Sequence, residues 1–160
     1  MKLYRIENDY IDYLRSFDDR VQENKYIRPY VGVILQVNNC DYYVPLASPK
    51  KKHTTMKNTI DFRKIAGGAL GAINFNNMIP ATNSVLTIID IDNYPDVKYR
   101  RLMQNQVKCL KRDWNNIVKV ANKLYRLVIK DDCDLSPNDR RIKDRCCDFL
   151  LLEEALRNYK

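Results

Sequence analysis

The stretch YVGVILQVNNCDYYVPL, residues 30–46, decides the fold class. Two runs rich in β-branched and aromatic residues flank Asn38-Asn39, and asparagine tolerates the positive φ that a tight turn requires. The stretch therefore predicts a β-hairpin with strands at residues 30–37 and 42–46. Because Pro45 has no N–H to donate, we expect the second strand to end or to reach a sheet edge there.

Shorter elements are predicted on both sides of this hairpin. An opening strand at residues 3–6 precedes a helix in which hydrophobic residues recur at helical spacing, with Asn8 or Asp9 as its cap. After the hairpin, two further strands are expected at residues 69–75 and 85–90.

Beyond Pro95 the pattern changes to that of helices. Hydrophobic residues advance by three or four positions from Tyr99 to Val128, which predicts one long helix or two helices that meet near residues 113–116. Ser136-Pro137 is a typical start for the last helix. Because strands come first and helices afterwards, the predicted class is α+β: a compact twisted antiparallel sheet or half-barrel with helices packed around it.

Length and composition exclude several classes of protein. The 160 residues fit a single domain, residues 1–160. The chain has neither a membrane-spanning apolar stretch nor the apolar run of a signal peptide at its start, so we expect a cytoplasmic protein. Five cysteines without a C-x-x-C pair indicate neither a disulfide framework nor a zinc ribbon. His53 is the only histidine, which excludes sites that need two imidazoles, and no metal or cofactor is expected.

The basic residues are concentrated in two segments, residues 48–64 and 98–130, whereas the whole chain carries a net charge of +8. Such a distribution is typical of a surface that binds phosphates. The alternative is that these are solvated side chains on a loop and a helix. On the first interpretation, the predicted RNA-binding residues are Arg28, Lys51, Lys52, Lys57, Arg63, Lys64, Arg100, Arg101, Lys108, Lys111 and Arg112.

The most informative segment for chemistry is PLASPKKKH, residues 45–53, at the end of the second hairpin strand. Cleavage of RNA without metal requires proton transfers at the 2′-OH and at the departing 5′-oxygen, and stabilisation of charge on the phosphate. Lys50 could stabilise that charge, Ser48 or His53 could position or move protons, and Tyr30 could reach the same place from the neighbouring strand. The alternative is a basic loop turned by Pro49, with His53 merely exposed.

Two other segments have some features of functional sites. Asp90, Asp92 and Asp96 could hold Mg²⁺ at a strand end, but their surroundings have the composition of a turn. The glycine-rich residues 67–71 lack the spacing of a phosphate-binding loop, and we expect a turn before a strand there.

The chain resembles the toxins of type III toxin-antitoxin systems, the ToxN/AbiQ-like endoribonucleases, nearly from end to end. The most specific match is P-L-x-S-P-K-x-x-H after the hairpin, at residues 45–53. Supporting matches are the opening MKLY with residues 10–18, PYVGV at residues 29–33, residues 74–80, and FLLLEE at residues 149–154.

The resemblance implies the compact barrel-like fold of the Kid/MazF toxins with extra helices. It also implies metal-independent cleavage that leaves a 2′,3′-cyclic phosphate and a 5′-OH, with Ser48, Lys50 and the Tyr30 region at the site. Some members have a threonine where this chain has Ala47, so that hydroxyl is missing here. Members are held inactive by a small structured RNA that the toxin cuts from a repeat transcript, and the two would assemble into a closed ring.

Three functions follow from these observations. The first is an endoribonuclease toxin that acts on cellular RNA and is inhibited by its own antitoxin RNA, with a role in defence against phage. The second is a non-catalytic module that binds structured RNA through the same basic surface. A DNA-binding regulator is a weaker third, because no helix-turn-helix signature is found among the predicted helices.

Overall fold

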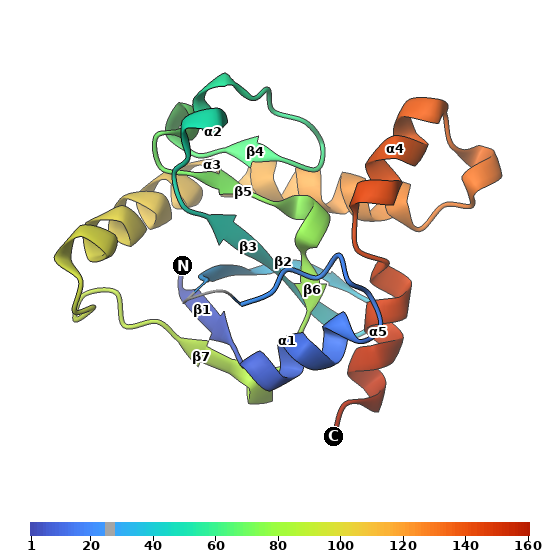
Figure 1. Ribbon diagram of the computed structural model, residues 1–160, viewed down its shortest axis with the longest axis horizontal. Coiled ribbons are helices and arrows are strands. Elements are labelled where there is room, and N and C mark those ends of the chain that lie inside the picture. Colours follow the sequence, from blue (N-terminus) through green and yellow to red (C-terminus); the bar gives the residue numbers. More distant parts are fainter. Residues whose placement is uncertain (25–27) are drawn as a thin grey trace.

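A computed structural model describes residues 1–24 and 28–160, and its described strands form one seven-stranded antiparallel sheet (Figure 1). The order along the sheet is β4-β5-β3-β2-β1-β7, and β6 also pairs with β3. Since β4 and β7 are the two ends of this path, the described sheet is open. The strands are β1 (Leu3–Ile6), β2 (Tyr30–Val37), β3 (Cys40–Ala47), β4 (Arg63–Lys64), β5 (Ala72–Ile73), β6 (Ile79–Pro80) and β7 (Leu86–Ile88).

The predicted hairpin is confirmed as β2 and β3. Asn38 and Asn39 have φ of 51° and 60°, the left-handed region that a two-residue turn requires. Val37 pairs with Cys40 directly beside the turn, so β3 begins two residues before the predicted start. This pair of long strands is the centre of the sheet, because β1 adds to β2 and both β5 and β6 add to β3.

Pro45 neither ends β3 nor lies at a sheet edge, so that expectation is wrong. β3 continues to Ala47 between β2 on one side and β5 and β6 on the other. β6 pairs with Tyr42 and Tyr43, whereas β5 pairs with Leu46 and Ala47. Pro45 therefore lies where one partner strand gives way to the next, and its missing N–H leaves no ladder bond broken. Its carbonyl accepts a hydrogen bond from the Asn74 N–H at 3.2 Å.

The other two predicted strands are shorter than expected. β5 covers only Ala72–Ile73, because the chain turns tightly on both sides of it. Gly71 has a φ of +93° and lies so close to the Ala47 carbonyl that a Cβ would clash. A 3₁₀ turn, Phe75–Asn77, follows directly. β7 covers Leu86–Ile88 and pairs with β1.

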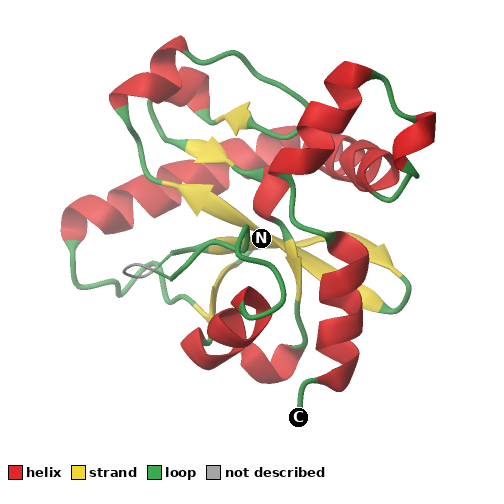
Figure 2. Cartoon of the chain, turned by 45° about the vertical axis from the view of Figure 1, so that its right-hand side comes forward, coloured by secondary structure: helices red, strands yellow, loops and turns green. Residues whose placement is uncertain are grey.

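The long basic segment forms a single 32-residue helix, α3 (Val97–Val128), which passes behind β4 and β5 (Figures 1 and 2). Asp96 caps its start by accepting a hydrogen bond from the Tyr99 N–H at 3.0 Å. Residues seven positions apart, which is about two helical turns, lie on one face, and of these Leu110, Ile117 and Leu124 are buried. Each such apolar side chain stabilises the fold by roughly 1.5–3 kcal/mol.

The remaining helices differ from the predictions in two places. α1 (Asn8–Arg15) is preceded by Glu7 and has no side-chain cap, so neither Asn8 nor Asp9 caps it. The expected last helix is two helices, α4 (Pro137–Arg145) and α5 (Phe149–Asn158), since the Cys147 N–H leaves the helical pattern to bond the Asn76 carbonyl at 2.8 Å. Ser136 caps α4 as predicted. A short helix, α2 (Lys51–Thr55), follows β3.

No helix among the described residues is long and apolar enough to cross a membrane. The buried hydrophobic side chains of the sheet, α1, α3 and α5 pack into a common cluster. This packing holds the end of β3 beside α2, β4 and β5 at one side of the molecule (Figure 1).

Candidate active site

A hollow of about 520 Å³ lies where β3 ends and α2 begins, and we call it the β3 hollow. Residues from the loop before β2, the β3–β4 segment, the turn after β5 and the end of α4 meet there. They are Gln22, Arg28, Ala47, Lys50, Lys52, His53, Met56, Lys57, Thr59, Asp61, Phe62, Asn74, Asn76, Asn77 and Arg145. Five of these side chains are cationic and one is a carboxylate, so the hollow attracts anions.

Lys50 and His53 are positioned by the backbone of α2. The Lys50 N–H donates to His53 Nδ1 at 3.3 Å, and the His53 N–H donates to the Lys50 carbonyl at 2.9 Å. This reciprocal pair satisfies backbone groups at the start of the helix. Because Nδ1 accepts a hydrogen bond, we assign the ring proton to Nε2.

His53 is buried, with 3% of its surface exposed, so the alternative of an exposed histidine is wrong. Its ring lies 5.8 Å from that of Phe62, centroid to centroid. Burial, reinforced by the charges of Lys50 and Lys52, lowers the pKa of His53 below its ordinary value. An uncharged imidazole therefore faces a group of cations, and this is a state in which it can exchange protons.

Asp61 and Arg145 join two parts of the wall. Arg145 donates from Nε and Nη2 to the two carboxylate oxygens of Asp61, at 3.1 and 3.2 Å, and Thr59 Oγ1 donates to Oδ1 at 2.8 Å. Asp61 is 5% exposed, so this bidentate pair holds the segment after α2 against the end of α4. The hydrogen bond with Asp61 raises the pKa of Arg145.

A row of amides lines another part of the wall. Asn77 donates from Nδ2 to the Arg20 carbonyl at 2.8 Å, and Gln22 donates from Nε2 to Asn77 Oδ1 at 2.7 Å. Asn74 and Asn76 line the same hollow. These amides were not predicted as site residues, although three asparagines within residues 74–77 are a visible signal. Asp61 and Arg145 were not predicted either, because the sequence holds no local signal for them.

A model of the toxin ToxN of type III toxin-antitoxin systems matches residues 2–157. The chain belongs to this family. The Endoribonuclease ToxN of Bacillus thuringiensis subsp. kurstaki is 34% identical over 164 residues, which cover 99% of this chain and 84% of that protein.

Two solved structures have the same fold. One, from a study of selective toxin inhibition by a non-coding RNA pseudoknot, has a TM-score of 0.87 and 33% identity, and the match covers 99% of this chain and 96% of that one. The other, from a bacterial antiviral system regulated by a processed non-coding RNA, has a TM-score of 0.81 and 28% identity, with 99% of each chain covered. The predicted fold class and the predicted family are therefore confirmed.

The four predicted catalytic residues of this ToxN-family chain occupy different environments. Lys50 and His53 both line the β3 hollow. Ser48 is exposed directly after β3, two residues before Lys50. Tyr30 is 1% exposed at the start of β2 and does not line the hollow. Burial raises the pKa of Tyr30, and the charge of nearby Arg28 opposes that rise.

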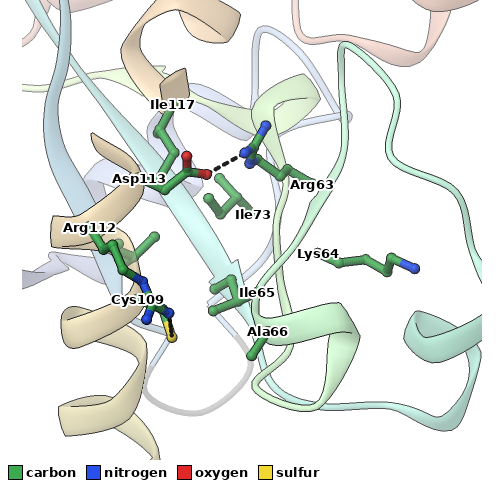
Figure 3. Close-up of a pocket in the computed structure, with 10 residues that line it drawn as sticks. Arg63, Lys64, Ile65, Ala66, Ile73, Cys109, Arg112, Asp113 and Ile117 are labelled. Atoms are coloured by element: carbon green, nitrogen blue, oxygen red, sulfur yellow. Dashed lines mark hydrogen bonds and ion pairs between the residues drawn. The ribbon is translucent and has the colours of Figure 1, made fainter. Parts of the chain in front are cut away.

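The predicted RNA-binding residues divide into three groups. Arg28, Lys52 and Lys57 line the β3 hollow, and Lys51 is exposed beside it. A second hollow of about 250 Å³ lies between β4 and α3 and includes Arg63, Lys64 and Arg112 (Figure 3). The third group lies on the first half of α3 and consists of Arg100, Arg101, Lys108 and Lys111.

The second hollow, which we call the β4–α3 hollow, is partly neutralised. Arg63 forms an ion pair with Asp113 across it, and Arg112 Nη2 lies 3.7 Å from Cys109 Sγ. Lys64 points away from α3 (Figure 3). Judged on the described residues, fewer cations without an ion pair converge here than in the β3 hollow.

The aspartates of residues 90–96 form a turn. Asp90 accepts hydrogen bonds from the N–H and the Nδ2 of Asn93, at 3.3 and 2.9 Å, and Asp92 Oδ1 accepts one from Gln104 at 3.1 Å. Within residues 1–24 and 28–160, no group of three or more His, Cys, Asp or Glu side chains is placed to hold a metal ion.

Proposed function

We propose that this protein is a metal-independent, sequence-specific endoribonuclease that cuts RNA in the β3 hollow. The observation that carries the proposal is the convergence of Lys50 and an uncharged His53 with Arg28, Lys52 and Lys57 in one cationic hollow. The names of the relatives, which are endoribonucleases, support the same activity.

The proposed reaction is an internal transesterification. The ribose 2′-oxygen attacks the adjacent phosphorus, the bond from phosphorus to the 5′-oxygen breaks, and the products carry a 2′,3′-cyclic phosphate and a 5′-OH. The 2′-OH loses a proton and the departing 5′-oxygen gains one, so the reaction needs no co-reactant. Lysine and arginine side chains stabilise the negative charge that develops on the phosphate oxygens in the transition state.

Each predicted catalytic residue has its own role in this reaction. Lys50 stabilises the charge on the scissile phosphate, and Ser48 positions that phosphate from the exposed end of β3. His53 exchanges protons through Nε2, because its Nδ1 is occupied by the Lys50 N–H. Tyr30 acts as a positioning residue behind Arg28, since its own side chain is buried. Since the chain has one histidine, the second proton transfer falls to a lysine of the hollow.

The proposed partner is a small structured RNA that the protein cuts from a repeat transcript and that then inhibits it. Two structural relatives come from systems with a non-coding RNA of this kind, one a pseudoknot and one processed. The basic side chains of α3 and of the β4–α3 hollow extend the cationic surface beyond the β3 hollow. We propose that each RNA unit bridges neighbouring protein chains in a closed ring, with one RNA end at the β3 hollow. Protein that is free of this RNA cuts cellular RNA in the cytoplasm during defence against phage.

Cleavage of RNA in excess EDTA tests the proposal. The purified protein should cut RNA at defined sequences, and each downstream fragment should accept phosphate from a polynucleotide kinase without prior dephosphorylation, because its 5′ end is a free hydroxyl. Cleavage that requires Mg²⁺, or 5′-phosphate ends, would overturn the mechanism. Salt-dependent binding with no new RNA ends would instead establish the non-catalytic RNA-binding module.

A further inference from the structure

Gln22 has an acceptor that nothing in the described part of the chain satisfies. Its Oε1 is buried and has no hydrogen-bond partner there, although the residue lines the β3 hollow. We propose that Gln22 is a specificity-determining residue whose Oε1 accepts a hydrogen bond from the amino group of a nucleobase next to the scissile phosphate. This inference rests on the proposed function.

The orientation of the Gln22 amide is fixed by its neighbours. Asn77 donates from Nδ2 to the Arg20 carbonyl at 2.8 Å, so its Oδ1 must face the other way. Gln22 can bond that oxygen only as a donor, and it does so from Nε2 at 2.7 Å. If either amide flipped, two acceptors or two donors would face each other. The carbonyl of Gln22 is therefore the group left to meet a ligand.

The chemistry of RNA decides what that carbonyl can bind. A phosphate oxygen is an acceptor and would repel it, whereas Arg28, whose Nε is also buried without a partner among the described residues, is a suitable donor to phosphate. Adenine, cytosine and guanine each carry an exocyclic amino group that donates. Uracil has no amino group, and its single ring N–H lies between two carbonyl oxygens whose repulsion of Oε1 weakens a hydrogen bond there. Gln22 therefore favours a base with an amino group and disfavours uracil.

The polarity of the site supports base recognition over charge recognition. Lys50, Lys52 and Lys57 supply charge in the same hollow, and Gln22 adds no charge. A neutral acceptor with a fixed direction distinguishes one base edge from another, whereas a lysine binds any phosphate. A buried carbonyl without a donor is also unfavourable in the free protein, and this favours a bound ligand that brings one.

The test is the base preference around the cleavage site for the Gln22→Met variant. Methionine has a similar length and no acceptor of comparable strength. An RNA library with random positions is cut in EDTA, and the 5′-OH ends are sequenced. The variant should keep cutting, and its discrimination against uracil at one position should fall roughly tenfold, as expected for the loss of one base contact. Gln36→Met is the matched control, because Gln36 also donates from Nε2 to a side-chain oxygen at 2.7 Å but lies outside the hollow.

A second measurement uses the unmodified protein, in case Gln22→Met fails to fold. The preferred base is replaced by the analogue that lacks only the amino group: purine riboside for adenosine, inosine for guanosine, or zebularine for cytidine. Cleavage should fall roughly tenfold. An unchanged base preference in Gln22→Met, or an unchanged cleavage rate on the analogue, overturns the role of Gln22. The proposed function is upheld in that case as long as the native protein cuts RNA in EDTA. If the native protein cuts no RNA in EDTA, both are overturned.

Discussion

Two polar clusters lie at opposite ends of β3, and they differ in how completely their groups are satisfied. At the start of the strand, the carboxylate of Glu153 is 2% exposed and accepts three hydrogen bonds. Tyr42 and Tyr125 donate to Oε1 at 2.7 Å each, and Asn38 donates to Oε2 at 3.0 Å. At the end of the strand, the β3 hollow gathers five cations and leaves Gln22 Oε1 and Arg28 Nε without partners among the described residues.

The difference separates a structural role from a binding role. Burial, together with the hydrogen bond to Glu153, raises the pKa of Tyr42 and of Tyr125 far above the usual tyrosine value, so both remain protonated donors. The Glu153 cluster thereby ties the hairpin turn, α3 and α5 together, and the carboxylate oxygens at its centre accept bonds from donors of the chain itself. The hollow, in contrast, keeps a donor of Arg28, an acceptor of Gln22 and positive charge that no described residue satisfies and that another molecule can. Three changes test this division, from the largest expected effect to the smallest.

The largest effect is expected for Lys50→Ala. Lys50 lines the hollow, so the loss of its ammonium group should lower the single-turnover cleavage rate by about 10²–10³-fold, as when other transition-state donors are removed. Because the side chain is exposed, the free energy of unfolding should change by less than about 0.5 kcal/mol. Lys51→Ala is the control: Lys51 is exposed next in sequence but lies outside the hollow, so its loss should weaken RNA binding yet change the single-turnover rate at saturating protein only slightly. Equal losses in the two variants would contradict a specific role for Lys50.

The opposite pattern is expected for Glu153→Gln. The amide keeps the shape of the carboxylate, but its N–H₂ group faces the donor of Asn38, and the hydrogen bonds from the two tyrosines weaken. Urea unfolding should show a loss of about 1–3 kcal/mol, while the cleavage rate per folded molecule stays the same. The neighbouring Glu154 is exposed, so Glu154→Gln should leave both quantities unchanged. A cleavage defect in Glu153→Gln at full stability would show that this cluster also serves the site.

How far the sequence predicts these two clusters depends on the distance between their residues. Residues 45–53 lie together in the chain, so one strand and one turn suffice to predict that Lys50 and His53 share a site. Gln22, Asp61 and Arg145 come from separate segments that meet only after tertiary packing, and no periodicity marks them. The break between α4 and α5 was hidden for the same reason, because it depends on a hydrogen bond from Cys147 to Asn76, distant in sequence.

Burial was the second property that sequence could not provide. Tyr30 stands at the start of a strand whose alternation allows either face, and the structure turns its side chain into the core. The Glu153 cluster was missed because a glutamate in a helical pattern ordinarily faces solvent. Pro45 shows the converse case. The rule that proline ends a central strand fails there because the partner of β3 changes from β6 to β5 beside it.

The smallest effect is expected for the pH dependence of stability, and it isolates His53. Its pKa is lowered in the folded protein by burial and by the charges of Lys50 and Lys52, whereas the unfolded chain has the ordinary value near 6.5. As pH falls below that value, the unfolded chain binds a proton before the folded protein does, so stability decreases with falling pH until the folded pKa is passed.

Because His53 is the only histidine, no other side chain with an ordinary pKa titrates between pH 5.5 and 7.5. The free energy of unfolding of the native protein should therefore fall as the pH is lowered from 7.5 to 5.5. In His53→Gln, whose amide oxygen can still accept a hydrogen bond from the Lys50 N–H, it should remain level over the same range. Parallel behaviour of the two proteins would mean that the ring is not held in its uncharged form, and proton exchange through Nε2 would lose its physical basis.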